Sequence, residues 1–318
     1  MEIKALVFKD KQLKLTERPQ PVPGEDEVLI QVKLAGICNT DLEIMDGYLG
    51  FEGIPGHEFV GRVIYDPEAE FTGQRVVGSI NISCYECFTC NQGLSNHCLN
   101  MRALGIRNKD GAFAEYLTLP RENIYPLPEV VTDKMAVFIE PMAAAVEIPE
   151  KVHLRPTDEV VVLGDGKLGL LTAQVFWAMG FDVKVIGKHQ EKLQIVKKLG
   201  IETFLPGELN RMVDVVVECT GSQSGVETAL KIVRPEGKIV LKTTTVEKPS
   251  LDLSQVAVNE IKIIGSRCGP FAPTLRLLER HKFPLEEMID SIFPLERGLA
   301  AFTRAKEKGV LKVLLEIS

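Results

Sequence analysis

The sequence predicts an α/β protein in which an all-β domain precedes a doubly wound parallel sheet. At 318 residues the chain is longer than one comfortable core, which favours two domains. Up to about residue 139, Gly- and Pro-rich turns separate short alternating runs such as 27–32, a pattern typical of a partly open barrel or sandwich. From about residue 140, apolar strands alternate with helical segments, because parallel strands need helical crossovers.

The expected elements of the second part follow in order along the chain. Apolar runs predict strands over 160–163, 183–186, 213–217 and 238–241. Helical patterns lie between them over 168–179 and 191–199, and the tail holds a helix over 273–279, an amphipathic stretch over 295–307 and a strand over 310–317. We expect this last strand to return to the β domain. The expected domains are therefore residues 1–139 with 269–318, and residues 140–268.

Composition excludes several classes of function. Hydrophobic residues make up 45% and charged residues 25%, as in ordinary globular proteins. The net charge is −7 and no basic run stands out, which disfavours binding to nucleic acid or to an anionic membrane. The N-terminus lacks the apolar segment of a signal peptide, and no apolar stretch approaches the ~20 residues of a membrane span. We expect a cytoplasmic protein.

Four of the seven cysteines fall within fifteen residues, which indicates a metal rather than a disulfide framework. Four thiolates can close a tetrahedral shell around zinc at ~2.3 Å per bond, and a closed all-sulfur shell is structural. The predicted ligands of this structural zinc are Cys84, Cys87, Cys90 and Cys98. His97 lies beside the last of them, and we expect it to be a bystander because the shell is already full.

A second, scattered set offers one thiol, one imidazole and two carboxylates. Such a mixed shell can keep a position for water or substrate, as catalytic zinc requires. The residues are Cys38, His57, Glu58 and Glu140. From spacing alone the set is weak, because a lone Cys or His is more often structural, and Glu140 with Pro141 could simply start a helix.

A glycine-rich run between a predicted strand and a predicted helix fits G-x-G-x-x-G. In this context the first glycine makes the turn, the second lets the backbone approach a pyrophosphate, and the third allows close helix–strand packing. The alternative is a plain strand-to-helix turn. The predicted dinucleotide-binding residues are Gly164, Gly166, Lys167, Leu168 and Gly169.

The end of the second strand bears on which nicotinamide cofactor is used. An NAD-selective site places an acid there, about 20 residues after the glycine turn, to accept from the ribose 2′-hydroxyl. Here the strand ends in Gly187, Lys188 and His189, with no acid. The glycine leaves room for a 2′-phosphate and Lys188 offers it a charge-assisted hydrogen bond, to which His189 and Lys192 could add. NADP is therefore expected to be preferred, with NAD possible; the alternative is a surface turn with a solvated lysine.

In combination these motifs resemble the zinc-containing medium-chain alcohol dehydrogenase family, in order and through essentially the whole chain. They are Gly36-Ile37-Cys38-x-Thr40-Asp41, Gly56-His57-Glu58-x-x-Gly61, the four-cysteine loop, the glycine turn, and Glu218-Cys219-Thr220-Gly221. The resemblance implies a GroES-like β catalytic domain and a Rossmann nucleotide-binding domain. It also implies that Thr220 and Gly221 contribute to the cofactor site.

The resemblance further implies roles for the scattered residues. Cys38 and His57 would bind a catalytic zinc, with Glu58 as a direct or exchangeable ligand. Glu140 stands where the polyol and threonine dehydrogenase branches carry glutamate, so the chain is similar to that group. The Thr40 hydroxyl would pass on the substrate proton. Relatives often carry histidine where Glu43 stands, so Glu43 or water would serve the outer relay; the chain is also compact, which predicts a shortened substrate loop.

The expected function is reversible oxidation of a secondary alcohol, polyol or amino alcohol, in a homodimer or homotetramer. Zinc would act as a Lewis acid on the substrate oxygen, and hydride would pass to the nicotinamide. The apolar run 261–264 would suit an edge used for association, or is an ordinary internal strand. Two rivals are a zinc-free quinone or enone reductase and a non-enzymatic nucleotide-binding protein; the retained zinc ligands count against both.

Overall fold

The computed structural model describes residues 1–242 and 249–318, which divide into two compact units. The first comprises Met1–Glu140 and Leu285–Ser318, and the second Pro141–Pro284. Residues 269–284, expected in the β domain, thus belong to the second unit. Packing at both ends of this segment explains the difference. A Cβ at Gly269 would lie 2.0 Å from the Ala143 carbonyl oxygen, and the ring of His281 lies 5.9 Å from that of Trp177.

The first unit is built on a seven-stranded sheet in the order β16-β17-β3-β4-β5-β9, with β8 also paired to β3. A separate antiparallel hairpin joins β1 (Glu2–Lys9) to β2 (Gln12–Pro19). The sheet strands are β3 (Glu27–Ile37), β4 (Glu58–Tyr65), β5 (Arg75–Gly78), β8 (Tyr116–Pro120), β9 (Ile124–Pro126), β16 (Ile289–Pro294) and β17 (Lys312–Glu316). The expected return of the C-terminal strand is confirmed, because β17 pairs antiparallel with β3.

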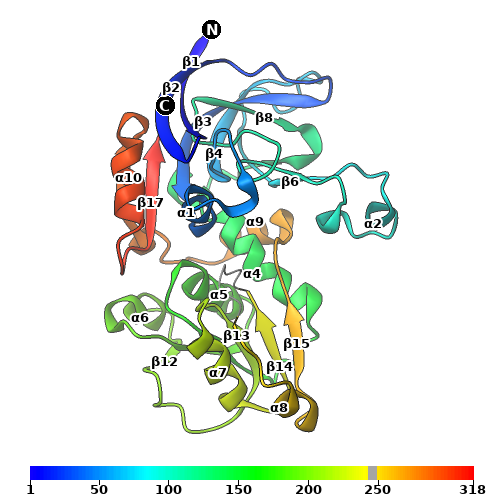
Figure 1. The fold of residues 1–318 in the computed structure, drawn as a ribbon, viewed down its shortest axis with the longest axis vertical. Helices are drawn as coiled ribbons and strands as arrows, with labels where there is room; N and C mark the ends of the chain where they lie inside the picture. The colour runs from blue at the N-terminus through cyan, green and yellow to red at the C-terminus, as the bar shows by residue number, and fades with distance from the viewer. Residues whose placement is uncertain (243–248) are drawn as a thin grey trace. The chain divides into compact units, whose positions relative to one another are not determined.

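Short helices and a small hairpin connect the strands of this unit. Helix α1 (Asn39–Met45) follows β3 directly, and α10 (Gly298–Ala305) precedes β17. Strands β6 (Asn81–Ile82) and β7 (Arg102–Ala103) pair at the base of a loop that carries α2 (Phe88–Asn91). Figure 1 shows this loop projecting from the sheet, with α2 near its tip. Helix α3 (Asp133–Ala136) lies after β9, and Thr132 caps it by accepting from the Met135 backbone N–H.

The second unit is a six-stranded parallel sheet in the order β12-β11-β10-β13-β14-β15. Its strands are β10 (Glu159–Leu163), β11 (Asp182–Ile186), β12 (Glu202–Phe204), β13 (Val213–Glu218), β14 (Val233–Leu241) and β15 (Lys262–Gly265). Strand β10 is central, and four of its five residues are buried, as a strand covered on both faces requires. The predicted doubly wound sheet is confirmed.

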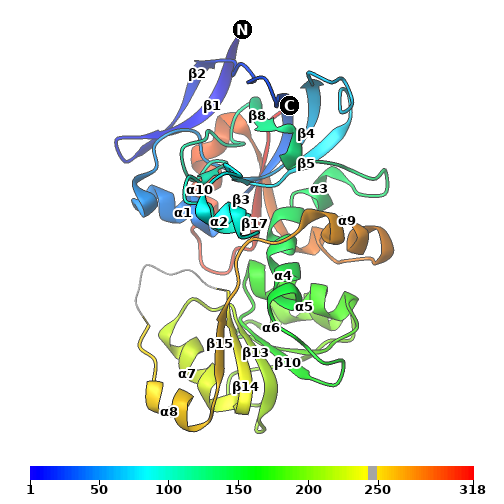
Figure 2. The ribbon, with the colours of Figure 1, turned by 90° about the vertical axis from the view of Figure 1, so that its right-hand side faces the viewer.

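Helices cover both faces of this sheet. Helices α5 (Lys167–Ala178) and α6 (Gln190–Lys197) lie on one face, and α7 (Gln223–Ile232) lies on the other (Figure 2). The unit also contains α8 (Leu253–Val258), α9 (Phe271–Arg280) and most of α4 (Ile139–Lys151). The strand order reverses direction beside β10, and in such sheets ligands bind at the carboxyl ends of the strands at this point.

Two further observations concern an edge of the parallel sheet and the membrane-spanning capacity of the helices. Strand β15, which contains most of the apolar run 261–264, is the last strand of its sheet among the described residues, so this run lies at an edge and not inside the sheet. Across 1–242 and 249–318, no helix combines the length and apolar character needed to span a membrane.

Candidate functional site

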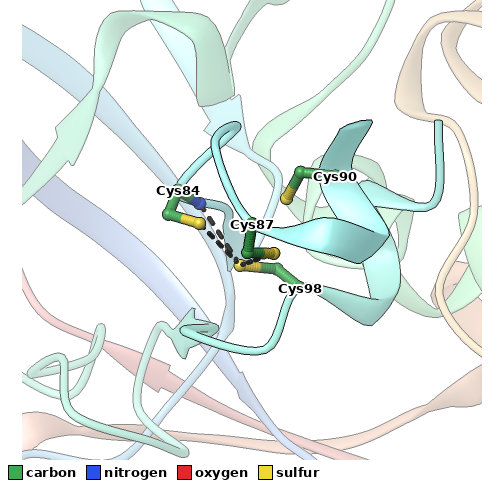
Figure 3. Close-up of side chains that lie close together, drawn as sticks. All are labelled: Cys84, Cys87, Cys90 and Cys98. Carbon is green, nitrogen blue, oxygen red and sulfur yellow. Dashed lines mark hydrogen bonds between the residues drawn. The ribbon is translucent and has the colours of Figure 1, made fainter. Parts of the chain in front are cut away.

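Four cysteines gather their sulfur atoms at one point on the projecting loop. The Sγ atoms of Cys84, Cys87, Cys90 and Cys98 all lie within 4.8 Å of one another. The Cys98 Sγ is 3.5 Å from Cys84 Sγ and 3.9 Å from Cys87 Sγ. A tetrahedron with ~2.3 Å Zn–S bonds has S···S edges of about 3.8 Å. Figure 3 shows the four side chains pointing toward a common centre, so the donor set fits a four-coordinate ion.

The surroundings of these thiols favour ionisation of Cys87 and oppose ionisation of Cys90. Hydrogen bonds from the Thr89 hydroxyl and from the backbone N–H groups of Cys90 and Leu99 lower the pKa of Cys87 to about 5. Burial and hydrogen bonds with Cys87 and Cys98 raise the pKa of Cys90 to about 12. Crowded thiolates repel one another, and a central cation relieves that repulsion. His97 is not part of this cluster.

A second cluster lies where β3 ends and β4 begins. Cys38 follows the last residue of β3 and His57 precedes the first residue of β4, and these strands pair antiparallel with Gly36 opposite Glu58. The register therefore brings Cys38, His57 and Glu58 together, with their ligand atoms within 4.8 Å of one another. His57 and Glu58 are buried and Cys38 is half-buried.

Asp41, which the sequence analysis assigned no role, organises this second cluster. Its carboxylate accepts from the backbone N–H of Cys38 at 2.8 Å and from that of Gly56 at 3.1 Å. Its Oδ1 lies 3.4 Å from His57 Nδ1. A carboxylate at one imidazole nitrogen orients the ring so that the other nitrogen faces a metal. Burial lowers the pKa of His57, but Asp41 and Cys38 outweigh burial and raise that pKa.

The two carboxylate oxygens of Glu58 have different surroundings. Its Oε2 accepts a hydrogen bond from Lys312 Nζ, and both side chains are about 1% exposed. Its Oε1 is buried and has no hydrogen-bond partner among the described residues. Gly36 makes room for this ion pair, since a Cβ there would lie 2.6 Å from Oε2 and 3.2 Å from Lys312 Cδ. A buried, unpartnered carboxylate oxygen beside a thiol and an imidazole fits a cation, because burying it unpaired is costly.

The remaining residues expected near this cluster are placed as follows. Thr40 is half-buried in the first turn of α1, with its Oγ1 3.9 Å from Cys38 Sγ. Glu43 lies three residues further, on the same face of that helix. Burial, and to a lesser degree the charge of Asp46, raises the pKa of Glu43. Glu140, in the first turn of α4, lies outside the 4.8 Å group.

The glycine turn has the geometry that its motif requires. Gly164 has φ +116°, a conformation that L side chains rarely adopt. Gly166 caps α5, and a Cβ there would meet no atom of the described residues within 4 Å, which leaves its surface open to a ligand. A Cβ at Gly169 would lie 2.1 Å from the Gly164 carbonyl oxygen, which explains the third glycine. Lys167 and Leu168 lie in the first turn of α5 and are half-buried.

Two other strand ends meet this turn. The Gly164 N–H donates to the Ile186 carbonyl at 2.8 Å, which holds the turn beside Gly187 at the end of β11. On the other side, the Cys219 N–H donates to the Leu163 carbonyl at 2.9 Å. Thr220 and Gly221 follow, and the Thr220 N–H and hydroxyl both donate to Glu218 Oε1. The carboxyl ends of β10, β11 and β13 thus form one continuous surface.

Basic residues follow the end of β11, and one acid from the glycine turn lies beside them. Lys188 and His189 are exposed, whereas Lys192 is 9% exposed. Asp165, the second residue of the glycine turn, accepts from the His189 backbone N–H at 2.6 Å. This contact between the glycine turn and the residue that caps α6 is not predictable from the sequence, because Asp165 and His189 lie 24 residues apart in different segments.

Comparison with known proteins is consistent with both clusters. The model of the alcohol dehydrogenase GroES-like domain matches residues 24–129, and that of the zinc-binding dehydrogenase matches residues 168–280. The starvation-sensing protein RspB of Escherichia coli K12 is 30% identical, with 98% of each chain covered. A sorbitol dehydrogenase of Halalkalibacterium halodurans is 28% identical, with 94% of each chain covered.

Solved structures show the same architecture. The rspB dehydrogenase of E. coli CFT073, in complex with NADH, has a TM-score of 0.90 at 27% identity, with 99% of each chain covered. A zinc-binding dehydrogenase of Sinorhizobium meliloti 1021, bound to NADP, has a TM-score of 0.90 at 26% identity, also with 99% of each chain covered. These two relatives differ in the cofactor they hold.

Proposed function

Because the chain belongs to the zinc-containing medium-chain alcohol dehydrogenase family, we propose that it interconverts an alcohol and its carbonyl with NAD or NADP. The substrate class is a secondary alcohol, polyol or amino alcohol. Relatives named for sorbitol, arabinitol and threonine support this class. Glu140, which takes the place of the cysteine of the alcohol dehydrogenase branch, supports it as well.

One observation carries the assignment of a catalytic metal. The Glu58 Oε1 is buried and has no hydrogen-bond partner in residues 1–242 and 249–318, and the ligand atoms of Cys38, His57 and Glu58 lie within 4.8 Å of one another. A site of one thiol, one imidazole and carboxylate suits zinc that keeps a position open. Cys38, His57 and Glu58 would hold this ion, and Glu140 is the further candidate ligand. Cys84, Cys87, Cys90 and Cys98 would hold the structural zinc.

Residues of the chain itself carry out the proton transfer and the orientation of the metal ligands. When bound, zinc supplies Lewis acidity toward the substrate oxygen, and the nicotinamide supplies the hydride acceptor. Thr40 accepts the hydroxyl proton of the alcohol at its Oγ1 and passes its own proton outward. Glu43, one turn along α1, receives that proton directly or through water. Asp41, whose Oδ1 lies 3.4 Å from His57 Nδ1, would keep the His57 ring oriented.

The nucleotide is proposed to bind over the carboxyl ends of β10, β11 and β13. The N-terminus of α5 attracts the pyrophosphate, and the open surface at Gly166 lets it approach the backbone. Gly164, Lys167, Leu168 and Gly169 shape this turn, and Thr220 and Gly221 line its other side. The exposed Lys188 is the cation best placed to favour a 2′-phosphate and so supports the NADP preference expected from the sequence, whereas His189 is also paired with Asp165.

We further propose self-association and a reducing compartment. Among the described residues, no strand pairs with the outer edge of β15, and Ile263 and Ile264 on this strand are apolar and half-buried. Pairing of two such edges would make a homodimer, and pairs of dimers a tetramer. None of the seven cysteines lies in a disulfide bond, which suits a reducing compartment such as the cytoplasm. The mass in solution, measured by light scattering, tests the association: a monomer would contradict it.

A turnover screen tests the proposed activity. Zinc-loaded protein is mixed with secondary alcohols, polyols and amino alcohols, each with NAD and with NADP, and reduced nicotinamide is followed by absorbance. We expect turnover with at least one class, and loss of it in Cys38→Ser. Turnover of quinones or enones that survives Cys38→Ser would indicate a zinc-free reductase instead. Nucleotide binding without turnover of any compound would indicate a binding protein.

A further inference from the structure

The Asp165 side chain reaches from the glycine turn to the end of the second strand. Its Oδ2 accepts from the His189 backbone N–H at 2.6 Å, and its two oxygens lie 3.2 and 3.0 Å from His189 Nδ1. Asp165 is 8% exposed, whereas the His189 side chain is 45% exposed. The carboxylate is therefore fixed in position by the backbone and the side chain of one residue.

Asp165 fills the space that a side chain at the end of β11 would use. A Cβ built on Gly187 would lie 2.6 Å from Asp165 Cβ, 2.7 Å from its Oδ2 and 2.9 Å from its Cγ. No side chain fits there while Asp165 is present. This packing explains why residue 187 is glycine, so Gly187 no longer indicates room made for a 2′-phosphate.

We propose that Asp165 is the acid that recognises the adenosine ribose, accepting from its 2′-hydroxyl and opposing a 2′-phosphate. This inference rests on the proposed nucleotide site. An NAD-selective site needs a carboxylate beside the end of the second strand, after the glycine turn. Here the carboxylate occupies that place but comes from within the turn itself. A pattern that looks for the acid about 20 residues later therefore misses it.

The carboxylate is held in its charged form. Burial raises the pKa of Asp165. The hydrogen bonds from His189 and the charges of His189 and Lys192 lower this pKa by more, so the net pKa is below the ordinary value. An ionised acid accepts strongly from a hydroxyl and repels a phosphate. Cofactor choice is thus a balance between Asp165 and the exposed Lys188.

Two opposite single substitutions separate these contributions. Asp165→Asn keeps the shape of the side chain and removes its charge, whereas Lys188→Ala removes the opposing cation. The Kd values of NAD and NADP are measured by calorimetry on zinc-loaded protein, without alcohol. We expect Asp165→Asn to shift the ratio of the two affinities by about tenfold or more toward NADP, because a charge-assisted hydrogen bond is lost and a repulsion relieved. Lys188→Ala should shift the ratio toward NAD.

The double variant Asp165→Gly/Gly187→Asp moves the carboxylate from the glycine turn to the conventional position at the end of β11. The site then still contains one carboxylate, in about the same space. We expect its affinity ratio to stay within about threefold of the wild type, less than the factor of ten that one charged contact supplies. An unchanged ratio in folded Asp165→Asn would overturn the inference. If Asp165→Asn does not fold, a tenfold shift toward NADP in the double variant would overturn it. Wild-type protein that binds neither nucleotide would instead contradict the proposed function.

Discussion

Lys312, on the last strand of the chain, donates a hydrogen bond to Glu58, 254 residues earlier on β4. Both side chains are about 1% exposed, and Glu58 adjoins His57 in the cluster proposed to hold catalytic zinc. Burial lowers the pKa of Lys312, but the charges of Glu58 and Cys38 raise it above the ordinary value. The C-terminal strand therefore supplies the countercharge of the metal cluster, which links closure of the β sheet to the chemistry of the site.

Removing the lysine should expose this dependence. Lys312→Met keeps the apolar stem of the side chain but leaves Glu58 buried and uncompensated, and we expect it to lower the free energy of unfolding by about 3 kcal/mol or more. Bound zinc offers Glu58 another cation, so the loss should be smaller in zinc-loaded protein. Urea unfolding with and without zinc measures both values.

A matched variant completes this test. Glu58→Gln/Lys312→Met removes both charges, and its stability without zinc should exceed that of Lys312→Met. Equal losses in the two variants would show that the pair contributes no compensation.

The two cysteine clusters should respond differently to the same substitution. Cys38→Ser is expected to lower kcat/KM by about a thousandfold, because Lewis acidity contributes several kcal/mol to the transition state. Its Tm should stay near that of the wild type. Cys87→Ser is expected to lower the Tm clearly, because a structural zinc supplies folding energy directly. Thermal unfolding and steady-state kinetics distinguish the two; interchanged effects would reverse the assignment of the sites.

Thr40→Val tests the proton path while preserving the shape of the side chain. General acid–base steps contribute ~10²–10⁴-fold, so turnover should fall within that range. The Kd of the nicotinamide cofactor should not change. Thr40→Ser, which restores a hydroxyl, serves as the control and should recover most of the turnover. Full activity in Thr40→Val would remove Thr40 from the relay.

The outer relay predicts a pH dependence. Burial and the charge of Asp46 raise the pKa of Glu43, so this carboxyl loses its proton at a higher pH than an ordinary glutamate. Alcohol oxidation needs the deprotonated form, and kcat should therefore rise with pH as Glu43 ionises. Glu43→Gln should abolish this rise. Asp46→Asn should move it to lower pH, because the neighbouring charge is gone; identical profiles in all three proteins would assign the relay to water.

Local patterns were predictable from the sequence, whereas contacts between distant residues were not. The glycine turn and the four-cysteine loop lie within short segments, so spacing alone predicts their geometry. Asp41 stands inside a recognised motif, yet only the positions of the Cys38 and Gly56 backbones show what it binds. Lys312 and Glu58 meet because β17 joins a sheet begun far earlier in the chain.

Two differences have clear physical causes. Residues 269–284 joined the second unit because Gly269 and His281 pack on elements of that unit, which no local pattern reports. The sequence has no acidic residue at the end of β11, but in the fold the side chain of Asp165, from the glycine turn, lies beside Gly187 at that strand end. A residue's position in the sequence therefore does not determine which strand end its side chain lies beside.

The zinc content of the purified protein tests the two-site account most directly. Elemental analysis of fully loaded wild-type protein should give two zinc ions per chain, because the two clusters form separate ligand sets on the described residues. Cys38→Ser should retain one of them. A wild-type value of one or less would contradict the account.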